Sequence, residues 1–233
     1  MRLAAEVPTP APAGWAGLPP AWQLCWREAM AAWQHGGAPI SAAVLGDEGQ
    51  VLALGRNHID DGAGCGLVRR HALAHAEVNA LLAFASDLVD GHQTLYTLLE
   101  PCPACLGMFY MSGIRRLAVA ARDPWAGSTN LLGTTPYLAL KPIRLQWAAL
   151  PALAAAVSVM QTLWRKQVHP QPGASDPLID RWQAAQPGPT QLGLQLWRSG
   201  WATERQATAG DQAAALYDEL AVLCAPLLDE DLS

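Results

Sequence analysis

The apolar residues of the chain recur at two spacings, one typical of helices and the other typical of strands. Steps of three and four residues predict a buried helix over Ala21–His35, a second over 150–166 and a third over Asp211–Leu228. Short apolar runs bounded by glycine, proline or aspartate predict strands instead. Five such runs occur, at about Ile40–Leu45, Val51–Arg56, Thr94–Leu99, Leu117–Ala121 and Pro142–Trp147.

Two more helices are predicted between these strands, over 74–86 and over Pro103–Met111. Proline suits the start of the second helix because the first helical position needs no intrahelical donor, and Gly113 ends it. Helices that separate successive strands imply right-handed crossovers. The pattern therefore predicts an α/β fold of three α/β/α layers with a mixed five-stranded sheet, followed by a C-terminal helical extension.

Proline and glycine divide the chain into three parts. Residues 1–20 are rich in proline and alanine and predict a flexible leader, residues 21–168 form the predicted domain, and residues 169–233 form a linker and an acidic helical extension. The prolines of His169–Pro177 mark the linker, and Pro187-Gly188-Pro189 marks a second break. Two interpretations of the extension are open: a lid or dimerisation arm, and extra helices packed on the core. We favour the second.

The composition is that of a globular protein, at 51% hydrophobic and 15% charged residues. We expect no membrane span, because no stretch of about 18 apolar residues is free of charge. The first 20 residues lack a basic start followed by an apolar core, so they do not predict a secretion signal. Three of the five cysteines, Cys25, Cys65 and Cys224, are scattered singly, which favours free thiols and a cytoplasmic location.

The net charge of −5 is unevenly distributed. Residues 170–233 hold three basic and nine acidic residues, a balance of −6, which leaves +1 for the other residues. Neither part predicts the strongly basic surface expected of a nucleic-acid-binding protein.

Two short segments carry the candidate chemistry: His75-Ala76-Glu77-Val78-Asn79-Ala80 and Glu100-Pro101-Cys102-Pro103-Ala104-Cys105. His75, Cys102 and Cys105 offer one imidazole and two thiolates, which leave the fourth position of a tetrahedral zinc open, as a catalytic zinc requires. Glu77, two residues after the histidine, can flank the metal and transfer protons without being a ligand. A lone Cys-x-x-Cys is as often a redox or structural motif, but the combination favours a zinc site.

These two segments resemble the zinc-binding motif of the cytidine/deoxycytidylate deaminase superfamily, and they are most similar to the branch of tRNA adenosine deaminases and guanine deaminases. The resemblance extends from about Ala21 to Val168. It implies that Asn57, after the second strand, contacts the sugar or base of the substrate. An ordinary turn asparagine is the alternative. The resemblance also implies that Asp123, after the fourth strand, is the acidic residue at the mouth of the pocket.

The resulting hypothesis is a zinc-dependent hydrolytic deaminase that acts on a nucleobase, a nucleoside or a small nucleotide-derived substrate and releases ammonia. We expect Zn²⁺ as its cofactor and a homodimer as its assembly. A tRNA-specific adenosine deaminase is the alternative, which we do not favour because few basic residues are available for RNA. A non-catalytic, zinc-stabilised partner subunit is a third possibility, against which the presence of Glu77 argues.

Overall fold

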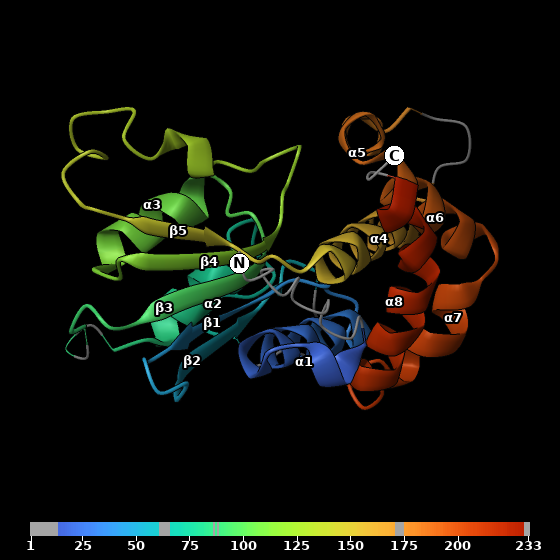
Figure 1. Cartoon of the computed structure of the whole chain (residues 1–233), viewed down its shortest axis with the longest axis horizontal. Coiled ribbons are helices and arrows are strands. Elements are labelled where there is room, and N and C mark those ends of the chain that lie inside the picture. The colour runs from blue at the N-terminus through green and yellow to red at the C-terminus, as the bar shows by residue number, and fades with distance from the viewer. Residues whose placement is uncertain (1–13, 61–65, 86, 88, 171–174, 231–233) are drawn as a thin grey trace, which may run out of the picture.

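A mixed five-stranded sheet forms the centre of the protein. The structure, a computed structural model, describes residues 14–60, 66–85, 87, 89–170 and 175–230. The strands follow the order β2-β1-β3-β4-β5 across the sheet (Figure 1). Their bounds are β1 (Ser41–Leu45), β2 (Val51–Arg56), β3 (Thr94–Leu99), β4 (Arg116–Ala121) and β5 (Arg144–Trp147).

The strand directions confirm the mixed sheet. Strand β1 pairs antiparallel with both β2 and β3, whereas β3, β4 and β5 run parallel to one another. The C-terminal ends of the parallel strands β3 and β4 therefore lie next to each other at one end of the sheet. Polar groups that follow different strands can meet there. The expected strand at Pro142 begins two residues later, at Arg144, and the other four lie within one residue of their predicted bounds.

Helices cover both faces of the sheet, as the three-layer prediction requires. One face packs against α1 (Pro20–Gln34) and α4 (Pro151–Val168), the other against α2 (Ala76–Ala83) and α3 (Pro103–Ser112). The helix predicted over Ala21–His35 contributes two tryptophans to the core, since Trp26 and Trp33 are at most 1% exposed. Helix α2 is shorter than the expected 74–86, because His75 and Phe84 both have extended backbone and flank it.

Helix α3 begins and ends as its sequence predicts. Cys102 precedes it in an extended conformation, Pro103 is its first residue, and Gly113 ends it with φ at +96°, a left-handed value that glycine tolerates best. Because α3 follows β3 after only three residues, Cys102 and Cys105 lie beside the C-terminal end of β3.

The described residues of the C-terminal extension form four α-helices and a short 3-10 helix. The α-helices are α5 (Pro177–Ala185), α6 (Pro187–Arg198), α7 (Trp201–Arg205) and α8 (Ala213–Glu230). Only the last was predicted as a separate helix. Pro177 and Pro187 were interpreted as breaks, but each is the first residue of a helix, where its missing N–H costs nothing.

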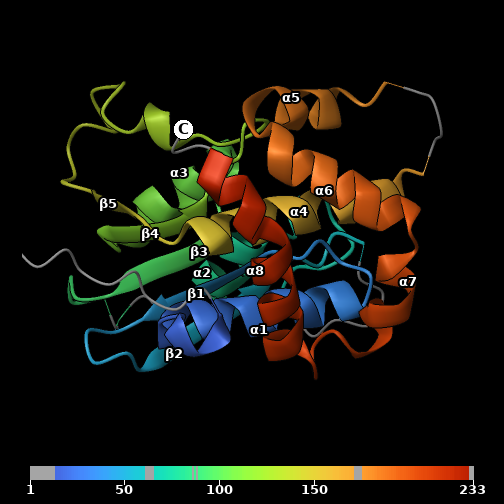
Figure 2. The same cartoon turned by 45° about the vertical axis from the view of Figure 1, so that its right-hand side comes forward.

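The extension packs on α1 and α4 and continues their hydrophobic core, as the favoured interpretation predicts. Figures 1 and 2 both show α8 beside α1 and α4. The indole of Trp26 donates to the carbonyl of Ala213, at 2.9 Å. Helix α6 lies so close to α4 that a Cβ at Gly193 would come within 2.8 Å of the Val159 carbonyl oxygen. The helices of the extension are therefore firmly attached.

The first described residues also join this core. The backbone N–H of Trp15 donates to Asp218 on α8 at 2.6 Å, and Leu18 is buried. The domain boundary at residue 20 stays a prediction, and residues 1–13 of the expected leader, like Cys65, lie outside the described part of the chain. None of the helices in the described part has the length and hydropathy to cross a membrane.

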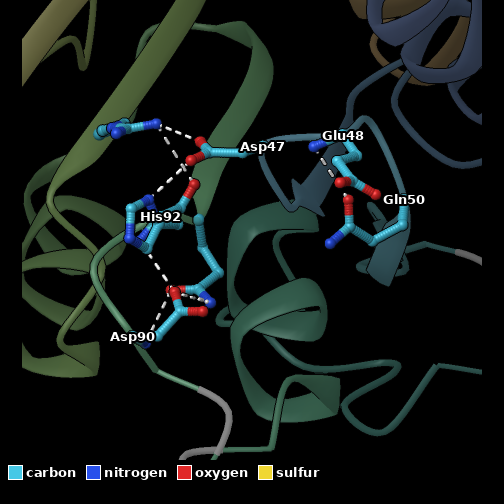
Figure 3. Close-up of polar contacts among 7 residues, drawn as sticks. Asp47, Glu48, Gln50, Asp90 and His92 are labelled. Atoms are coloured by element: carbon cyan, nitrogen blue, oxygen red, sulfur yellow. Dashed lines mark hydrogen bonds and ion pairs between the residues drawn. The ribbon is translucent and has the colours of Figure 1, made fainter.

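A polar cluster around Asp47 lies at the opposite end of the strands, in the turn between β1 and β2 (Figure 3). The Asp47 carboxylate contacts the imidazole of His92 at 2.6 Å and the guanidinium of Arg116. The hydrogen bond with His92, together with Arg116, lowers the pKa of Asp47. These contacts join the turn to the starts of β3 and β4.

Candidate active site

Three side chains converge where β3 leads into α3. His75 is the residue before α2, Cys102 is the residue before α3, and Cys105 lies in the first turn of α3. The Nδ1 atom of His75 lies 3.6 Å from the Cys102 sulfur and 3.4 Å from the Cys105 sulfur, and the two sulfurs are 3.4 Å apart. The structure thus brings together all three residues that the sequence predicts as metal ligands.

The chemistry and spacing of this group fit zinc. A tetrahedral zinc with ligand distances of about 2.0–2.3 Å separates neighbouring ligand atoms by about 3.5–3.8 Å, close to the separations found here. Hydrogen bonding with Cys105 lowers the pKa of Cys102 to about 4, while the same contact and burial raise the pKa of Cys105. The two thiols thus readily yield one thiolate, and a bound cation would favour the second.

Glu77 lies beside this group and is almost completely buried. It is 4% exposed, and burial raises its pKa. Its Oε1 atom is 2.8 Å from the hydroxyl of Thr97, which is also 3.0 Å from the carbonyl oxygen of Leu99. The Thr97 hydroxyl can donate to either of these oxygens, and its hydrogen bond to Glu77 acts to lower the pKa that burial raises. Thr97 was not predicted as a site residue. The pattern of side chains along β3 gave no indication that Thr97 contacts Glu77.

The His75, Glu77 and Cys102 side chains lie in the wall of a pocket of about 170 Å³. Asn57 and Asp123, the two predicted substrate-binding residues, also line it. The pocket therefore collects five of the six predicted site residues, and Cys105 lies directly behind its wall.

Asn57 and Asp123 are both held by local backbone contacts. The side-chain oxygen of Asn57 accepts from the N–H of Ile59 at 3.2 Å, which is the turn geometry of the alternative interpretation. The Asp123 carboxylate accepts from the N–H groups of Trp125 and Ala126, at 2.8 and 3.2 Å. Burial raises the pKa of Asp123 despite these bonds.

Glu100 is a pocket residue that the sequence analysis missed. It is 8% exposed, and its carboxylate accepts from the hydroxyl and the N–H of Thr129 and from the N–H of Asp123. It thereby joins the end of β3 to the segment that follows β4. The residue was visible in the motif, but its partners lie 23 and 29 positions away and only the fold brings them close.

The extension and the helix before it supply another part of the pocket wall. Gln161, Trp164 and Arg165 line it from α4, and Leu178 and Trp182 line it from α5. The apolar spacing over 150–166 predicted a buried helix there but no pocket residue, and α5 was not predicted. No periodic signal in the sequence indicates that these side chains reach the pocket.

Comparison with known proteins identifies the region that carries the site. Residues 21–121 match the family described as the cytidine and deoxycytidylate deaminase zinc-binding region. The match includes both candidate ligand motifs and ends before Asp123, α4 and α5.

Three curated relatives are similar to the chain. A tRNA(Ile)-lysidine synthase of Deinococcus deserti is 34% identical over 122 residues, 51% of this chain and 20% of that protein. A tRNA-specific adenosine deaminase of Bacillus subtilis is 32% identical over 110 residues, 46% of this chain and 63% of that protein. A guanine deaminase of Bacillus subtilis is 33% identical over 89 residues, 36% of this chain and 51% of that protein.

The chain thus spans less than two thirds of the length of each of these relatives. Within the shared region, the motifs, the mixed sheet and the family match agree. Residues 21–121 thus resemble the cytidine and deoxycytidylate deaminase zinc-binding region, and the chain is similar over part of its length to tRNA adenosine deaminases and to a guanine deaminase.

Proposed function

We propose that the protein is a zinc-dependent hydrolytic deaminase acting on a nucleobase, a nucleoside or a small nucleotide-derived substrate. The observation that carries this proposal is the convergence of His75, Cys102 and Cys105 beside a buried carboxyl group in the wall of a pocket. The reaction replaces an exocyclic amine by an oxo group and releases ammonia.

In this proposal His75, Cys102 and Cys105 hold the metal through one nitrogen and two sulfur atoms. A bound zinc would make water a nucleophile near neutral pH and leave one coordination position open for it. The starts of α2 and α3 both point their N–H groups toward this end of the pocket, which favours the thiolate form of the cysteines.

Glu77 is the proposed proton carrier. Its carboxylate would take one proton from the attacking water and deliver it to the ring nitrogen. It would then take the second proton from the new hydroxyl group on the ring carbon and deliver it to the amine, which departs as ammonia. Burial keeps the pKa of this group above that of an ordinary glutamate, so it can hold a proton between these steps. The Thr97 hydroxyl would fix the carboxyl group in position.

Asn57 and Asp123 are the proposed substrate-binding residues. They approach the pocket from the ends of β2 and β4, so they can contact the polar edge of a ring from two sides. The small volume of the pocket favours a free base or nucleoside, since pockets for drug-sized ligands measure about 300–1,000 Å³. The similarity to a guanine deaminase supports a free base.

The similarity to a tRNA-specific adenosine deaminase keeps tRNA adenosine as the second candidate. A non-catalytic partner subunit is disfavoured, because a structural zinc has no use for a buried glutamate beside its ligands. The homodimer and the cytoplasmic location stay predictions.

Elemental analysis and an ammonia assay on the purified full-length protein test the proposal. We expect about one zinc per chain and ammonia release from at least one member of a panel of adenine, guanine, cytosine, their nucleosides and a tRNA anticodon stem-loop. A protein that carries no zinc after purification in its presence, or that releases no ammonia from the whole panel, would contradict the proposal. Efficient conversion of the stem-loop alone would favour the second candidate.

A further inference from the structure

Helix α5 is anchored on two sides of the pocket. Toward α4, the Asp176 carboxylate accepts from the Arg165 guanidinium at 2.8 and 3.3 Å. Toward β4, Arg181 donates to the carbonyl of Pro124 and Gln186 donates to the carbonyl of Arg122, both at 3.3 Å. These two carbonyls flank Asp123. Helix α5 therefore spans from α4 to the segment that carries a proposed substrate-binding carboxylate.

The side chains between these anchors are apolar and mostly aromatic. Leu178 and Trp182 of α5 and Trp164 of α4 line the pocket, and Trp182 is 2% exposed. The indole of Trp164 is held by the carbonyl of Gly36, at 3.4 Å. Fixed aromatic side chains suit a flat heteroaromatic ring, which can stack on them or meet their edges.

The charges around the pocket are unfavourable for a phosphate. Among the described lining residues, three carry carboxyl groups (Glu77, Glu100 and Asp123) and Arg165 is the single lysine or arginine. The guanidinium of Arg165 is already neutralised by Asp176. The charge of a bound zinc would be balanced by the two cysteine thiolates, so it would leave the excess of negative charge in place.

An RNA substrate faces the same charges and a steric obstacle. A base that is deaminated within RNA must leave its stack and enter the pocket while its ribose and both phosphates stay outside. Leu178 and Trp182 occupy the wall on the side of α5, and the described part of the rim offers no unpaired cluster of cations to hold the backbone.

We infer that α5 is a fixed cap that restricts the pocket to a free, unphosphorylated heteroaromatic base and disfavours the same base in a nucleotide or in RNA. This inference rests on the proposed function and narrows it to one substrate class. In this inference Leu178 and Trp182 limit the space available to the substrate in the pocket. The Arg165–Asp176 ion pair determines the net charge at the edge of the cap.

The first test compares substrates on the zinc-loaded full-length protein. Guanine, adenine and cytosine are each assayed for ammonia release beside their nucleosides and 5′-monophosphates, with a tRNA anticodon stem-loop as the RNA probe. We expect kcat/KM for the best base to exceed that for its monophosphate by about 100-fold, the effect of like charges at short range in a partly buried site. Conversion of the nucleoside, the monophosphate or the stem-loop as efficiently as the base would overturn the inference and leave the deaminase proposal intact.

The second test changes the charge of the cap without changing its shape. Asp176→Asn removes the negative charge that neutralises Arg165 at the pocket. The ratio of kcat/KM for the base to kcat/KM for its monophosphate should therefore fall by about tenfold. Glu219→Gln is the matched control, because it breaks a similar two-bonded pair with Arg205 in the same extension, away from the pocket. It should leave the preference unchanged.

Arg165→Gln gives an independent measurement. Because it removes the cation at the pocket, it should raise the ratio of kcat/KM for the base to kcat/KM for its monophosphate above that of the unchanged protein. Thermal unfolding of all three variants shows that each is folded before the substrates are compared. Equal effects of Asp176→Asn and Glu219→Gln, or a narrower preference in Arg165→Gln, would overturn the inference. Loss of ammonia release from every compound in the unchanged protein would instead contradict the proposed function.

Discussion

The two sides of the pocket differ in chemistry and in origin. The side formed by residues between 57 and 123 is mostly polar and contains two of the three candidate metal ligands together with Glu77, Glu100 and Asp123. The side formed by residues 161–182 is mostly apolar, and its one charged group is paired with Asp176. In the proposed function, one part of the chain carries the chemistry while another controls which substrate reaches it.

The ionisable groups support the same division. On the polar side, burial raises the pKa of Glu77 and Asp123, and contact with Cys105 lowers that of Cys102. Displaced pKa values are typical of groups that transfer protons or bind metals. Asp176, at the edge of the apolar side, also has a displaced pKa, but its lowering is explained by the ion pair with Arg165.

Loss of a ligand should have the largest effect. We expect Cys102→Ala to lose its zinc, all measurable ammonia release and part of its stability, because metal binding is coupled to folding. Cys224→Ala, a buried cysteine of α8 away from the pocket, is the control and should keep its zinc. Elemental analysis and the ammonia assay decide the outcome, and a Cys102→Ala protein with full zinc content would contradict the assignment.

Loss of the carboxylate should be the next largest effect. Glu77→Gln should keep zinc and fold but lower kcat by about 10²–10⁴, the usual contribution of a general acid–base group. Glu204→Gln, at an exposed position of α7, serves as the control. An unchanged kcat for Glu77→Gln would mean that the residue only supports the structure.

A change on the apolar side should affect binding rather than chemistry. Leu178→Ala should raise KM for the preferred base about fivefold at similar kcat, since loss of apolar contact of ~1 kcal/mol corresponds to that factor. Leu192→Ala is the matched control, because Leu192 is also half-buried against the same core but does not line the pocket. A fall in kcat alone would show that the two sides are not separate in function.

Asn57→Ala should have a smaller effect that distinguishes its two interpretations. A substrate contact would make any nucleoside conversion fall about threefold more than conversion of the free base, as for the net loss of one hydrogen bond. A turn asparagine would affect both substrates equally. The measured quantity is the ratio of the two kcat/KM values in the variant and in the unchanged protein.

The smallest expected effect concerns stability and pH. Although burial acts to raise the pKa of Asp176, its bonds with Arg165 lower that pKa below the ordinary value. The pair therefore contributes stability above the unfolded-state pKa of ~3.9 and loses it as pH falls through the folded-state value. Asp176→Asn should be less stable by ~1 kcal/mol or less at pH 7, and this difference in the free energy of unfolding should shrink as the pH falls below ~3.9, as measured by urea unfolding.

The polar side could be predicted from the sequence and the apolar side could not. His75, Glu77 and Cys102 occur in motifs whose chemistry is explicit, and the strands and helices around them follow clear periodicities. Glu100 and Thr97 were missed because their roles depend on neighbours brought together by the fold. Helix α5 was missed because a proline at its first position was interpreted as a break, although proline is favoured there.

The contact between Trp15 and α8 bears on which fragments of this protein can be produced. The first described turn and the last helix are joined by a hydrogen bond, and Trp26 and Trp33 of α1 pack against residues beyond 200. A truncated protein ending near residue 168 would expose these indoles to water and leave large apolar surfaces for self-association. Residues 21–121 can be recognised in isolation by comparison, but we expect a fragment limited to them to aggregate when it is expressed.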